Sequence, residues 1–282
     1  MLLGDLELLT VSGGTYRIDG GTMFGIIPKA LWSRVFPCDD DNDIFQATNC
    51  VLVRGDGRTV LIDTGYGAKL PEKMRRNLHT EEGDPLAASL AARGVLPEEI
   101  DTVILSHLHF DHAGGATALA ADGSLTRAFP NAEYVVQRGE WDEATAGRIE
   151  LKNAYPQENI VSLGEQGVLR LIEGDVEIVP GIRSLVTGAH TRWHQALVIE
   201  SGGETAIYLA DLCPTTRHMP TFWGMAYDVD PLRTRRFKPE LLGRIADEDW
   251  LALFDHDPDH AAARLRRDDR REFVIAEGYA AL

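Results

Sequence analysis

The sequence predicts a layered α/β fold in which two β-sheets are each covered by helices. Short β-rich runs alternate with helical patterns along the chain, and one apolar strand near its middle runs straight into a histidine-rich cluster. A length of 282 residues permits one large domain or two small ones. No internal repeat, low-complexity run or linker rich in Pro, Gly or Ser divides the sequence. We therefore expect a single domain over residues 1–282.

The first half of the chain is expected to begin with strands and to continue with helices. The tripeptide Gly55-Asp56-Gly57 separates two β-rich runs and is a hairpin signal. Leu86, Leu90 and the neighbouring alanines give one apolar face, which predicts a helix over residues 85–93. After the histidine-rich cluster, residues 113–121 have the pattern of a helix. The predicted strands cover residues 6–11, 49–53, 59–63 and 101–106.

The second half is expected to continue the alternation of strands and helices. Residues 168–172 and 176–179 are predicted to form a hairpin around Glu173-Gly174-Asp175. Helices are predicted over residues 240–253 and 259–267. The remaining predicted strands cover residues 133–136, 182–186, 196–200 and 205–210.

The charge of the chain argues against a nucleic-acid partner. The formal net charge is −16 and the sequence pI is about 4.9. Nucleic-acid enzymes normally carry a basic stripe, and an acidic surface repels phosphate backbones. The basic residues between Arg264 and Arg271 are interleaved with Asp268 and Asp269, which favours a solvated helix face.

Cysteine usage and hydropathy predict a cytoplasmic enzyme with no membrane partner. Cys38, Cys50 and Cys213 are an odd number of cysteines without a CxxC motif, which favours a reducing compartment over a disulfide framework. The N-terminal segment lacks the basic and apolar regions of a signal peptide. No stretch of the chain approaches the ~20 apolar residues of a membrane span.

The chemistry is expected at His107-Leu108-His109-Phe110-Asp111-His112, directly after the predicted strand 101–106. In an extended chain alternate side chains point the same way, so the imidazoles of His107 and His109 can reach one metal ion. Asp111 and His112 follow where the chain turns into a helix, and their side chains can reach a second ion nearby. Imidazole nitrogen combined with carboxylate oxygen suits zinc, and also manganese, iron or cobalt. The pattern therefore predicts a centre of two divalent metal ions, with zinc first among the candidates.

Two ions need further ligands, and three candidate side chains follow apolar runs later in the chain. His190 lies just beyond the predicted strand 182–186, Asp211 ends the apolar run 206–210, and His256 follows a third run. The ends of strands are where α/β folds build their sites. Taken one at a time, each of these residues is more typical of an ordinary loop.

Together these residues resemble the metallo-β-lactamase-fold hydrolases. The family's pattern is a strand ending in Asp-x-Gly, then HxHxDH, then Gly-His-Thr, then an Asp after a strand, then a late His. In this chain the pattern falls on Asp63, the cluster, His190, Asp211 and His256, in that order. The resemblance covers nearly the whole chain and implies a four-layer αββα sandwich. It further implies His107, His109 and His190 on one ion, Asp111, His112 and His256 on the other, Asp211 bridging both, and Asp63 steadying the cluster.

The chain departs from the family pattern at two positions. Ala189 replaces the Gly of Gly-His-Thr, and one added methyl group at this turn is compatible with the motif. His194 matches the last histidine of the longer pattern Gly-His-Thr-x-x-His, and we expect it to have a structural role. Acyl-homoserine lactonases place a Tyr three residues after the bridging Asp, where this chain has Pro214. We expect His218 or Tyr227 to take over the role of that Tyr as a catalytic donor to the substrate carbonyl.

Within the family, the sequence is most similar to the lactonase branch, which includes N-acyl-homoserine lactonases and quorum-quenching relatives. The similarity lies in residues 20–29, 210–215 and 254–257. The apolar residues 23–27 either form a wall for an acyl chain or belong to the core, and both alternatives stay open. The resemblance implies a hydrolase of a small-molecule lactone or ester, and a homodimer is an open alternative for its assembly.

The two ions suggest a mechanism for lactone opening. Metal binding lowers the pKa of water from about 15.7 to about 7, so a bridging hydroxide is expected to attack the carbonyl. Asp111 is expected to carry the proton to the departing alkoxide. An organophosphorus triester hydrolase and a hydrolase of other esters or thioesters remain alternatives. A catalytically silent metal-binding module is disfavoured, because structural zinc sites usually have Cys ligands.

Overall fold

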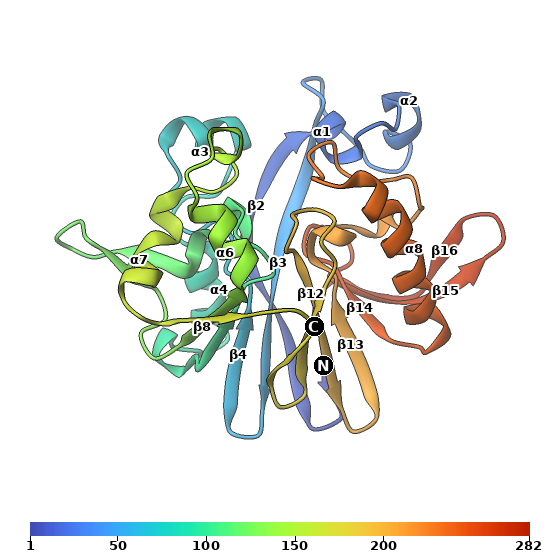
Figure 1. The fold of residues 1–282 in the computed structure, drawn as a ribbon. Coiled ribbons are helices and arrows are strands. Elements are labelled where there is room, and N and C mark those ends of the chain that lie inside the picture. Colours follow the sequence, from blue (N-terminus) through green and yellow to red (C-terminus); the bar gives the residue numbers. More distant parts are fainter.

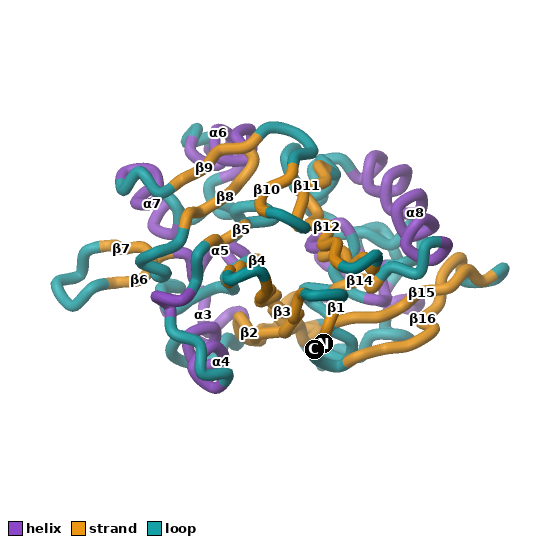
Figure 2. The backbone as a smooth tube through the Cα atoms, turned by 90° about the horizontal axis from the view of Figure 1, so that it is seen from below, coloured by secondary structure: helices purple, strands orange, loops and turns teal.

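Two seven-stranded β-sheets pack face to face in the computed structural model, which describes residues 1–282. Helices cover the outer face of each sheet (Figures 1 and 2). The predicted αββα sandwich is therefore confirmed.

The first sheet is antiparallel over its first four strands and parallel over the rest. Asp56 and Gly57 close the predicted hairpin as a two-residue turn, with φ angles of 51° and 69°. Both residues thus adopt the left-handed conformation that a type I′ turn requires. In spatial order the strands are β1 (Leu2–Leu3), β2 (Leu6–Asp19), β3 (Asp43–Gly55), β4 (Arg58–Ile62), β5 (Thr102–Ile104), β8 (Glu133–Gln137) and β9 (Leu169–Ile172).

The second sheet takes the later strands, and only its fourth and fifth strands pair in parallel. The long segment between these two strands leaves the sheet and returns as a helix that covers its outer face (Figure 1). In spatial order the strands are β10 (Glu177–Val179), β11 (Ile182–Val186), β12 (Gln195–Ser201), β13 (Glu204–Tyr208), β14 (Leu251–Leu253), β15 (Ala262–Asp268) and β16 (Glu272–Tyr279).

The apolar core lies in three layers, because the strands present buried side chains on alternate faces. Between the sheets, a cluster of 21 buried residues includes Ile62 and Leu197. A second cluster joins the first sheet to α4 (Pro85–Ala92) through Leu86 and Leu90. A third cluster packs the second sheet against α8 (Pro231–Asp247).

Capping side chains explain where two of the helices begin. Asp84 accepts a hydrogen bond from Ala87 N, and Asp230 accepts one from Arg233 N. In both helices a Pro at the first helical position follows the cap, which is a strong start signal. None of the helices combines the length and the apolar composition that crossing a bilayer requires. The other helices are α1 (Gly20–Phe24), α2 (Lys29–Trp32), α3 (Glu72–Leu78), α5 (Phe110–Ala113), α6 (Arg138–Thr145) and α7 (Val161–Glu165).

The helix predicted over residues 113–121 is wrong. Helix α5 ends at Ala113, a short 3-10 turn follows, and the chain then forms strand β6 (Thr117–Leu119), paired with β7 (Leu125–Arg127). A Cβ atom on Gly115 would lie 2.2 Å from the carbonyl oxygen of Thr64. The close approach of two backbones therefore decides the conformation here, and the apolar pattern does not.

The hairpin predicted over residues 168–179 is also wrong. Strand β9 pairs with β8 in the first sheet, whereas β10 pairs with β11 in the second, so the chain crosses between the sheets here (Figure 2). The side chain of Gln137 fixes the crossing, because it donates to Gly174 O at 2.9 Å and accepts from Gly174 N at 3.0 Å. Turn residues mark the bend without indicating which sheet each flanking strand joins.

The C-terminal region forms one helix and three strands, which corrects the prediction of two helices. Helix α8 ends at Asp247, so residues 251–253 form β14 and not the end of a helix. Residues 262–267 lie in β15, where Ala263 and Leu265 join the core under α8. This burial of alternate side chains is the signature of a strand. The basic segment from Arg264 to Arg271 thus lies on the β15–β16 hairpin and not on a helix face.

Candidate metal centre

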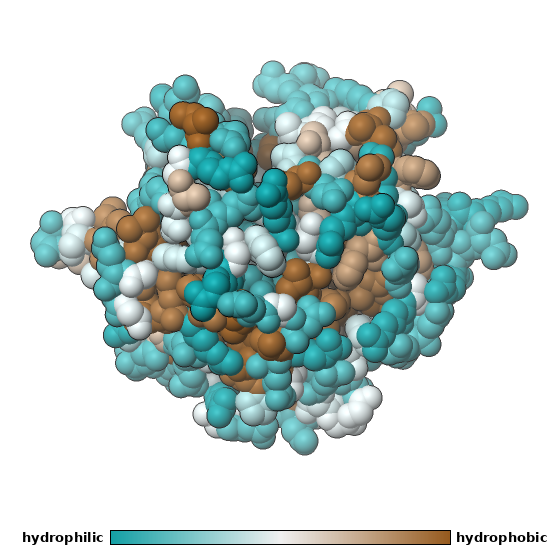
Figure 3. All heavy atoms as spheres, in the orientation of Figure 1, coloured by the Kyte–Doolittle hydropathy of each residue, from teal (hydrophilic) through white to brown (hydrophobic).

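The seven predicted metal ligands come from both sheets and gather where strands end. All of them are buried except His109, which is partly exposed. Figure 3 shows the surface hollowed between the two halves of the molecule at the top of the view, above these strand ends. His107 and His109 follow β5, Asp111 and His112 lie in α5, His190 follows β11, Asp211 follows β13 and His256 follows β14.

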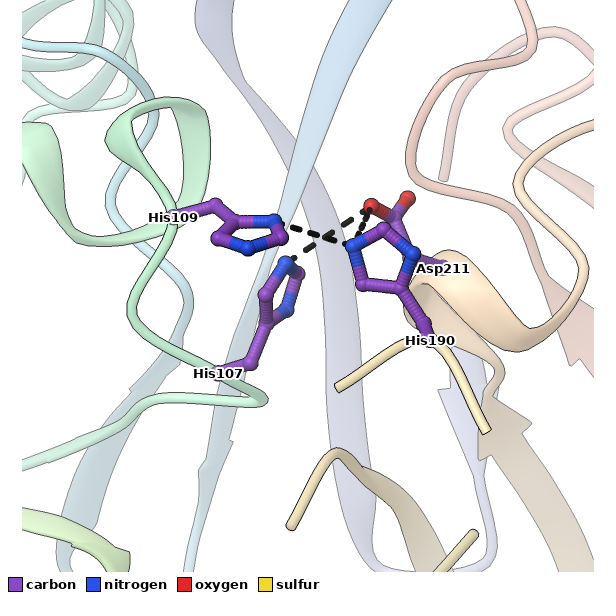
Figure 4. Close-up of side chains that lie close together, drawn as sticks. All are labelled: His107, His109, His190 and Asp211. Atoms are coloured by element: carbon purple, nitrogen blue, oxygen red, sulfur yellow. Dashed lines mark hydrogen bonds and ion pairs between the residues drawn. The ribbon is translucent and has the colours of Figure 1, made fainter. Parts of the chain in front are cut away.

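Four of these side chains form a first group, made of His107, His109, His190 and Asp211 (Figure 4). The Nε2 atom of His190 lies 2.9 Å from His109 Nδ1 and 3.0 Å from Asp211 Oδ2. His107 Nε2 lies 3.6 Å from the same carboxylate oxygen. Three imidazoles and one carboxylate therefore converge on a volume of the size of one metal ion.

A second group adjoins the first and shares Asp211 with it. Its members are His112, Asp211, Asp255 and His256, whose ligand atoms lie within 4.8 Å of one another. His256 Nε2 is 3.3 Å from Asp211 Oδ1, and His112 Nε2 is 3.7 Å from Asp211 Oδ2. Oδ2 of Asp211 thus faces the first group and His112 of the second, while Oδ1 faces His256, so the carboxylate lies between the two groups as a bridging ligand would.

Several ligand atoms of the two groups are buried without a hydrogen-bond partner. They are His107 Nε2, His112 Nε2, Asp211 Oδ1 and both carboxylate oxygens of Asp255. An unsatisfied buried polar group costs about 1–3 kcal/mol, and more when it is charged. Their concentration at one place fits a cation that supplies the missing partner, so these residues fit the metal ions that the sequence predicts.

Neighbouring groups hold three of the imidazoles so that their Nε2 atoms point inward. His112 Nδ1 lies 2.8 Å from Asp63 Oδ2, and His190 Nδ1 lies 3.1 Å from Asp228 Oδ1. His256 Nδ1 lies 2.8 Å from the carbonyl oxygen of Ala47. Carboxylate and carbonyl partners of this kind orient metal-binding histidines and raise their basicity. The sequence analysis selected Asp63 for this role and missed Asp228.

Asp63 also ties the cluster to the sheets. Its carboxylate accepts hydrogen bonds from Ser106 N and Ser106 Oγ, both at 2.7 Å, and from Tyr208 OH at 3.0 Å. Its own φ angle of 58° lies in the left-handed region, which costs energy for a residue with a Cβ. The strained turn after β4 therefore serves to aim this carboxylate at the cluster.

Asp111 lies beside the second group rather than inside it. Its Oδ2 atom is 3.5 Å from His256 Nε2, and its Oδ1 atom is 3.9 Å from His112 Nε2. The hydroxyl of Tyr16, a residue of β2, donates to Asp111 Oδ2 at 2.8 Å. No local motif marks Tyr16, so sequence analysis missed it.

The carboxylates control the protonation of the cluster. Burial by itself lowers the pKa of His190 and of His112, but nearby carboxylates raise both. The pKa of His190 is raised to about 10 by Asp211 and Asp228. The pKa of His112 is raised to about 9 by Asp111, Asp63 and Asp211. Burial, and then neighbouring histidines, lower the pKa of His107 and His109. Protons therefore compete with metal ions for His190 and His112 but not for His107 and His109.

His218, a predicted catalytic donor, has no nitrogen free for a substrate. Its Nδ1 atom lies 2.8 Å from Thr215 Oγ1, and its Nε2 atom lies 2.8 Å from the carbonyl oxygen of Met23. The fully buried ring also stacks on Phe24 with centroids 4.6 Å apart. The geometry argues against the predicted catalytic role and gives His218 a structural one.

Tyr227, the other predicted donor, lies next to the first group. Its ring packs edge-on against His190 with centroids 5.6 Å apart, and 40% of the residue is exposed. Its hydroxyl lies 2.9 Å from the sulfur of Met23, which is a weak acceptor. Of the apolar residues 23–27, Met23 and Phe24 belong to a buried hydrophobic cluster and are therefore part of the core. Ile26 is exposed.

Asp255 is a member of the second group that sequence analysis did not select. It stands between Phe254 and His256, directly after β14. Burial, together with the Asp211 carboxylate, raises its pKa. Its position immediately before the late histidine is the signal that would have found it.

Comparison with known proteins places these features in context. The model of the metallo-beta-lactamase superfamily matches residues 44–268 of the chain. An N-acyl homoserine lactonase of Bacillus cereus is 32% identical over 166 residues, which cover 54% of this chain and 58% of the lactonase. The chain therefore spans little more than half the length of that relative. A probable metallo-hydrolase of Mycobacterium tuberculosis is 25% identical over 276 residues, which cover 84% of this chain and 85% of that protein.

Solved structures show the same architecture over nearly the whole chain. A probable metal-dependent hydrolase of Staphylococcus aureus superposes with a TM-score of 0.89 and 34% identity, covering 99% of this chain and 100% of the other. A quorum-quenching N-acyl homoserine lactone lactonase superposes with a TM-score of 0.67 and 26% identity, covering 91% and 93%.

Proposed function

The chain belongs to the metallo-β-lactamase superfamily, and from this premise we propose that it is a dinuclear metal-dependent hydrolase that opens lactone rings. N-acyl homoserine lactones are the first candidate substrates. The observation that carries the proposal is the pair of adjoining groups that share Asp211, with buried ligand atoms that lack any other partner. The 32% identity to a lactonase supports the substrate class.

The two groups would each hold one divalent ion. His107, His109 and His190 would hold the first, His112 and His256 with Asp111 the second, and Asp211 would bridge them. Three imidazoles with one carboxylate suit zinc at the first position. When bound, the ions would supply Lewis acidity and a nucleophile at neutral pH.

The side chains around the ions would handle the protons of the reaction. Lactone opening breaks the bond between the carbonyl carbon and the ring oxygen, and that oxygen must gain a proton. Asp111 would take the proton from the attacking water and deliver it to the ring oxygen, and its hydrogen bond from Tyr16 at the edge of the second group supports this role. Tyr227 is exposed enough to turn its hydroxyl from Met23 towards a substrate carbonyl.

A substrate panel tests the proposal. The metal-loaded protein would be assayed on acyl homoserine lactones of different chain length, simple lactones, phosphotriesters, thioesters and a β-lactam. We expect turnover of lactones, lost in Asp211→Ala together with both ions and retained in Asp269→Asn, which removes one exposed charge on the β15–β16 hairpin.

Two results would overturn the proposal. Efficient turnover of phosphotriesters with every lactone inert would replace it by an organophosphorus hydrolase. Two bound ions without turnover of any compound in the panel would favour a silent metal-binding module.

A further inference from the structure

We propose that Asp255 is a ligand of the second ion and that it makes this half of the centre accept a harder ion, manganese(II), more readily than the first half does. The inference rests on the dinuclear centre of the proposed function and deepens it, because it states how the two metal positions differ. Asp255 contributes an additional carboxylate to the ligands that resemblance to the family implies.

The contacts of Asp255 place its carboxylate inside the second group. Its Oδ2 atom lies 3.3 Å from His256 Nε2 and 3.8 Å from His112 Nε2. Those two nitrogens are the ligand atoms through which the histidines would reach the ion. The residue is fully buried, so water does not solvate the carboxylate from outside.

The buried carboxylates around the centre have hydrogen-bond donors, apart from the bridging Asp211, whose Oδ1 atom is unpartnered, and Asp255, which has none on either oxygen. Asp63 accepts from Ser106 and Tyr208, and Asp228 accepts from Thr234 Oγ1 at 3.1 Å. Asp257, two residues further on, accepts from Thr216 N and from Arg217. Both oxygens of Asp255 lack a hydrogen-bond partner. Its nearest polar neighbours are the inward-pointing nitrogens of His256 and His112, so a metal ion held by those nitrogens would also be the partner of this carboxylate.

The two positions of the centre then differ in their donor atoms. The first group offers three imidazole nitrogens and one carboxylate, whereas the second offers two imidazole nitrogens and the carboxylates of Asp211 and Asp255. Asp111 adds a third carboxylate at the edge of the second group. Imidazole-rich sites suit zinc, and carboxylate-rich sites suit manganese, so the same chain provides one position of each kind.

Metal titration of purified protein tests this assignment without using activity. The metal-free protein would receive one equivalent of zinc and then increasing manganese, with bound manganese followed by electron paramagnetic resonance and total metal by elemental analysis. Asp255→Asn keeps the shape and removes the charge, and Asp255→Ala removes the ligand altogether. Asp269→Asn is the control for the loss of one negative charge, because this residue is exposed and has no ion-pair partner.

We expect the parent chain and Asp269→Asn to bind zinc at the first position and manganese at the second. Groups that only orient a metal ligand are worth about 10- to 100-fold in affinity, so losing a ligand should weaken manganese at the second position by at least about tenfold. Affinity for the first zinc should stay the same, and at the second position the affinity for manganese should fall more than the affinity for zinc. Thermal unfolding of the metal-free Asp255→Asn protein should occur at about the same temperature as in the parent, because the side chain makes no hydrogen bond that the amide would lose.

The outcomes separate this inference from the proposed function. Two ions in the parent chain, with unchanged second-site affinity and preference in both Asp255 variants, would overturn the role of Asp255 and leave the dinuclear centre standing. A parent chain that binds no more than one ion would overturn the dinuclear centre itself. A lower unfolding temperature of metal-free Asp255→Asn with unchanged metal affinity would assign Asp255 a structural role.

Discussion

The hydroxyl of Tyr16 lies 2.8 Å from Asp111 Oδ2, and this hydrogen bond joins strand β2 to helix α5. The ring of Tyr16 also packs edge-on against His256, with centroids 5.8 Å apart. Burial, and then the Asp111 carboxylate, raise the pKa of Tyr16, so the phenol keeps its proton and remains a donor. One side chain therefore contacts both the carboxylate proposed to move protons and a proposed ligand of the second ion.

Tyr16→Phe is expected to lower kcat while the chain keeps both metal ions. Without the hydrogen bond Asp111 is free to turn, so we expect kcat to fall about 10- to 100-fold, a part of the ~10²–10⁴-fold that positioned proton transfer contributes. The KM should change little. The matched control is Tyr66→Phe, whose hydroxyl donates to Thr15 O in the same aromatic cluster and does not touch Asp111. An equal loss in both variants would indicate that only packing matters.

Asp111→Asn separates metal binding from proton transfer. The amide keeps the size of the side chain and one oxygen, but it has no charge and no titratable group. Metal affinity should fall, and excess metal should restore full occupancy. Activity should stay about 10²–10⁴-fold lower even then, because added ions do not replace the proton carrier. Turnover and metal content measured on the same sample decide the matter, and a near-parental rate at full occupancy would make Asp111 a ligand and nothing more.

Removal of the metal should make the stability of the folded chain fall as the pH rises. The pKa values of His190 and His112 are about 10 and about 9 in the folded chain, against about 6.5 in an unfolded one. Between pH 6.5 and these raised pKa values, the folded chain binds more protons than the unfolded chain does. Protonation of the two histidines therefore stabilises the fold fully below about pH 6.5, and this stabilisation is lost as the pH rises through 9 and 10. Metal ions replace these protons. Thermal unfolding from pH 7 to 10 should therefore show a steeper decline for chelator-treated protein than for metal-loaded protein, and equal declines would contradict the assignment.

His218→Phe should reduce stability and leave catalysis intact. Phe keeps the stacking on Phe24 but leaves the partners Thr215 and Met23 O without their hydrogen bonds. The free energy of unfolding should fall by about 1–3 kcal/mol for each buried group left unpaired. Denaturant unfolding measures the first effect and kcat the second. A large fall in kcat in a fully folded variant would restore the catalytic role expected from the sequence.

Tyr227→Phe should give the opposite result, with activity reduced and stability unchanged. A donor aimed at the developing charge of an acyl-transfer reaction is worth about 10²–10³-fold in kcat. The side chain is partly exposed, and its hydroxyl contacts only the weakly accepting sulfur of Met23, so little stability depends on it. Activity that matches the parent on every substrate in the panel would remove Tyr227 from the mechanism.

The sequence by itself determined those features that depend on neighbouring residues. The turn at Asp56-Gly57 follows from the left-handed conformations that these two residues tolerate. The cluster from His107 to His112 follows from an apolar strand that ends in alternating histidines. The α/β layering follows from the alternation of strand and helix patterns. Each of these properties is a matter of local conformation and side-chain periodicity, which consecutive residues carry with them.

The tertiary structure decided which distant residues meet. Tyr16 reaches Asp111, and Asp255 joins His112, because strand pairing within the two sheets and the packing of one sheet on the other bring the ends of separate strands together. Residues 262–267 have a composition that suits a helix, yet pairing with β16 makes them a strand. Long-range pairing overrides local propensity in such segments. The sequence therefore indicated a candidate metal centre and most of the side chains that gather there, while the fold determined that one half of this group is richer in carboxylates than the other.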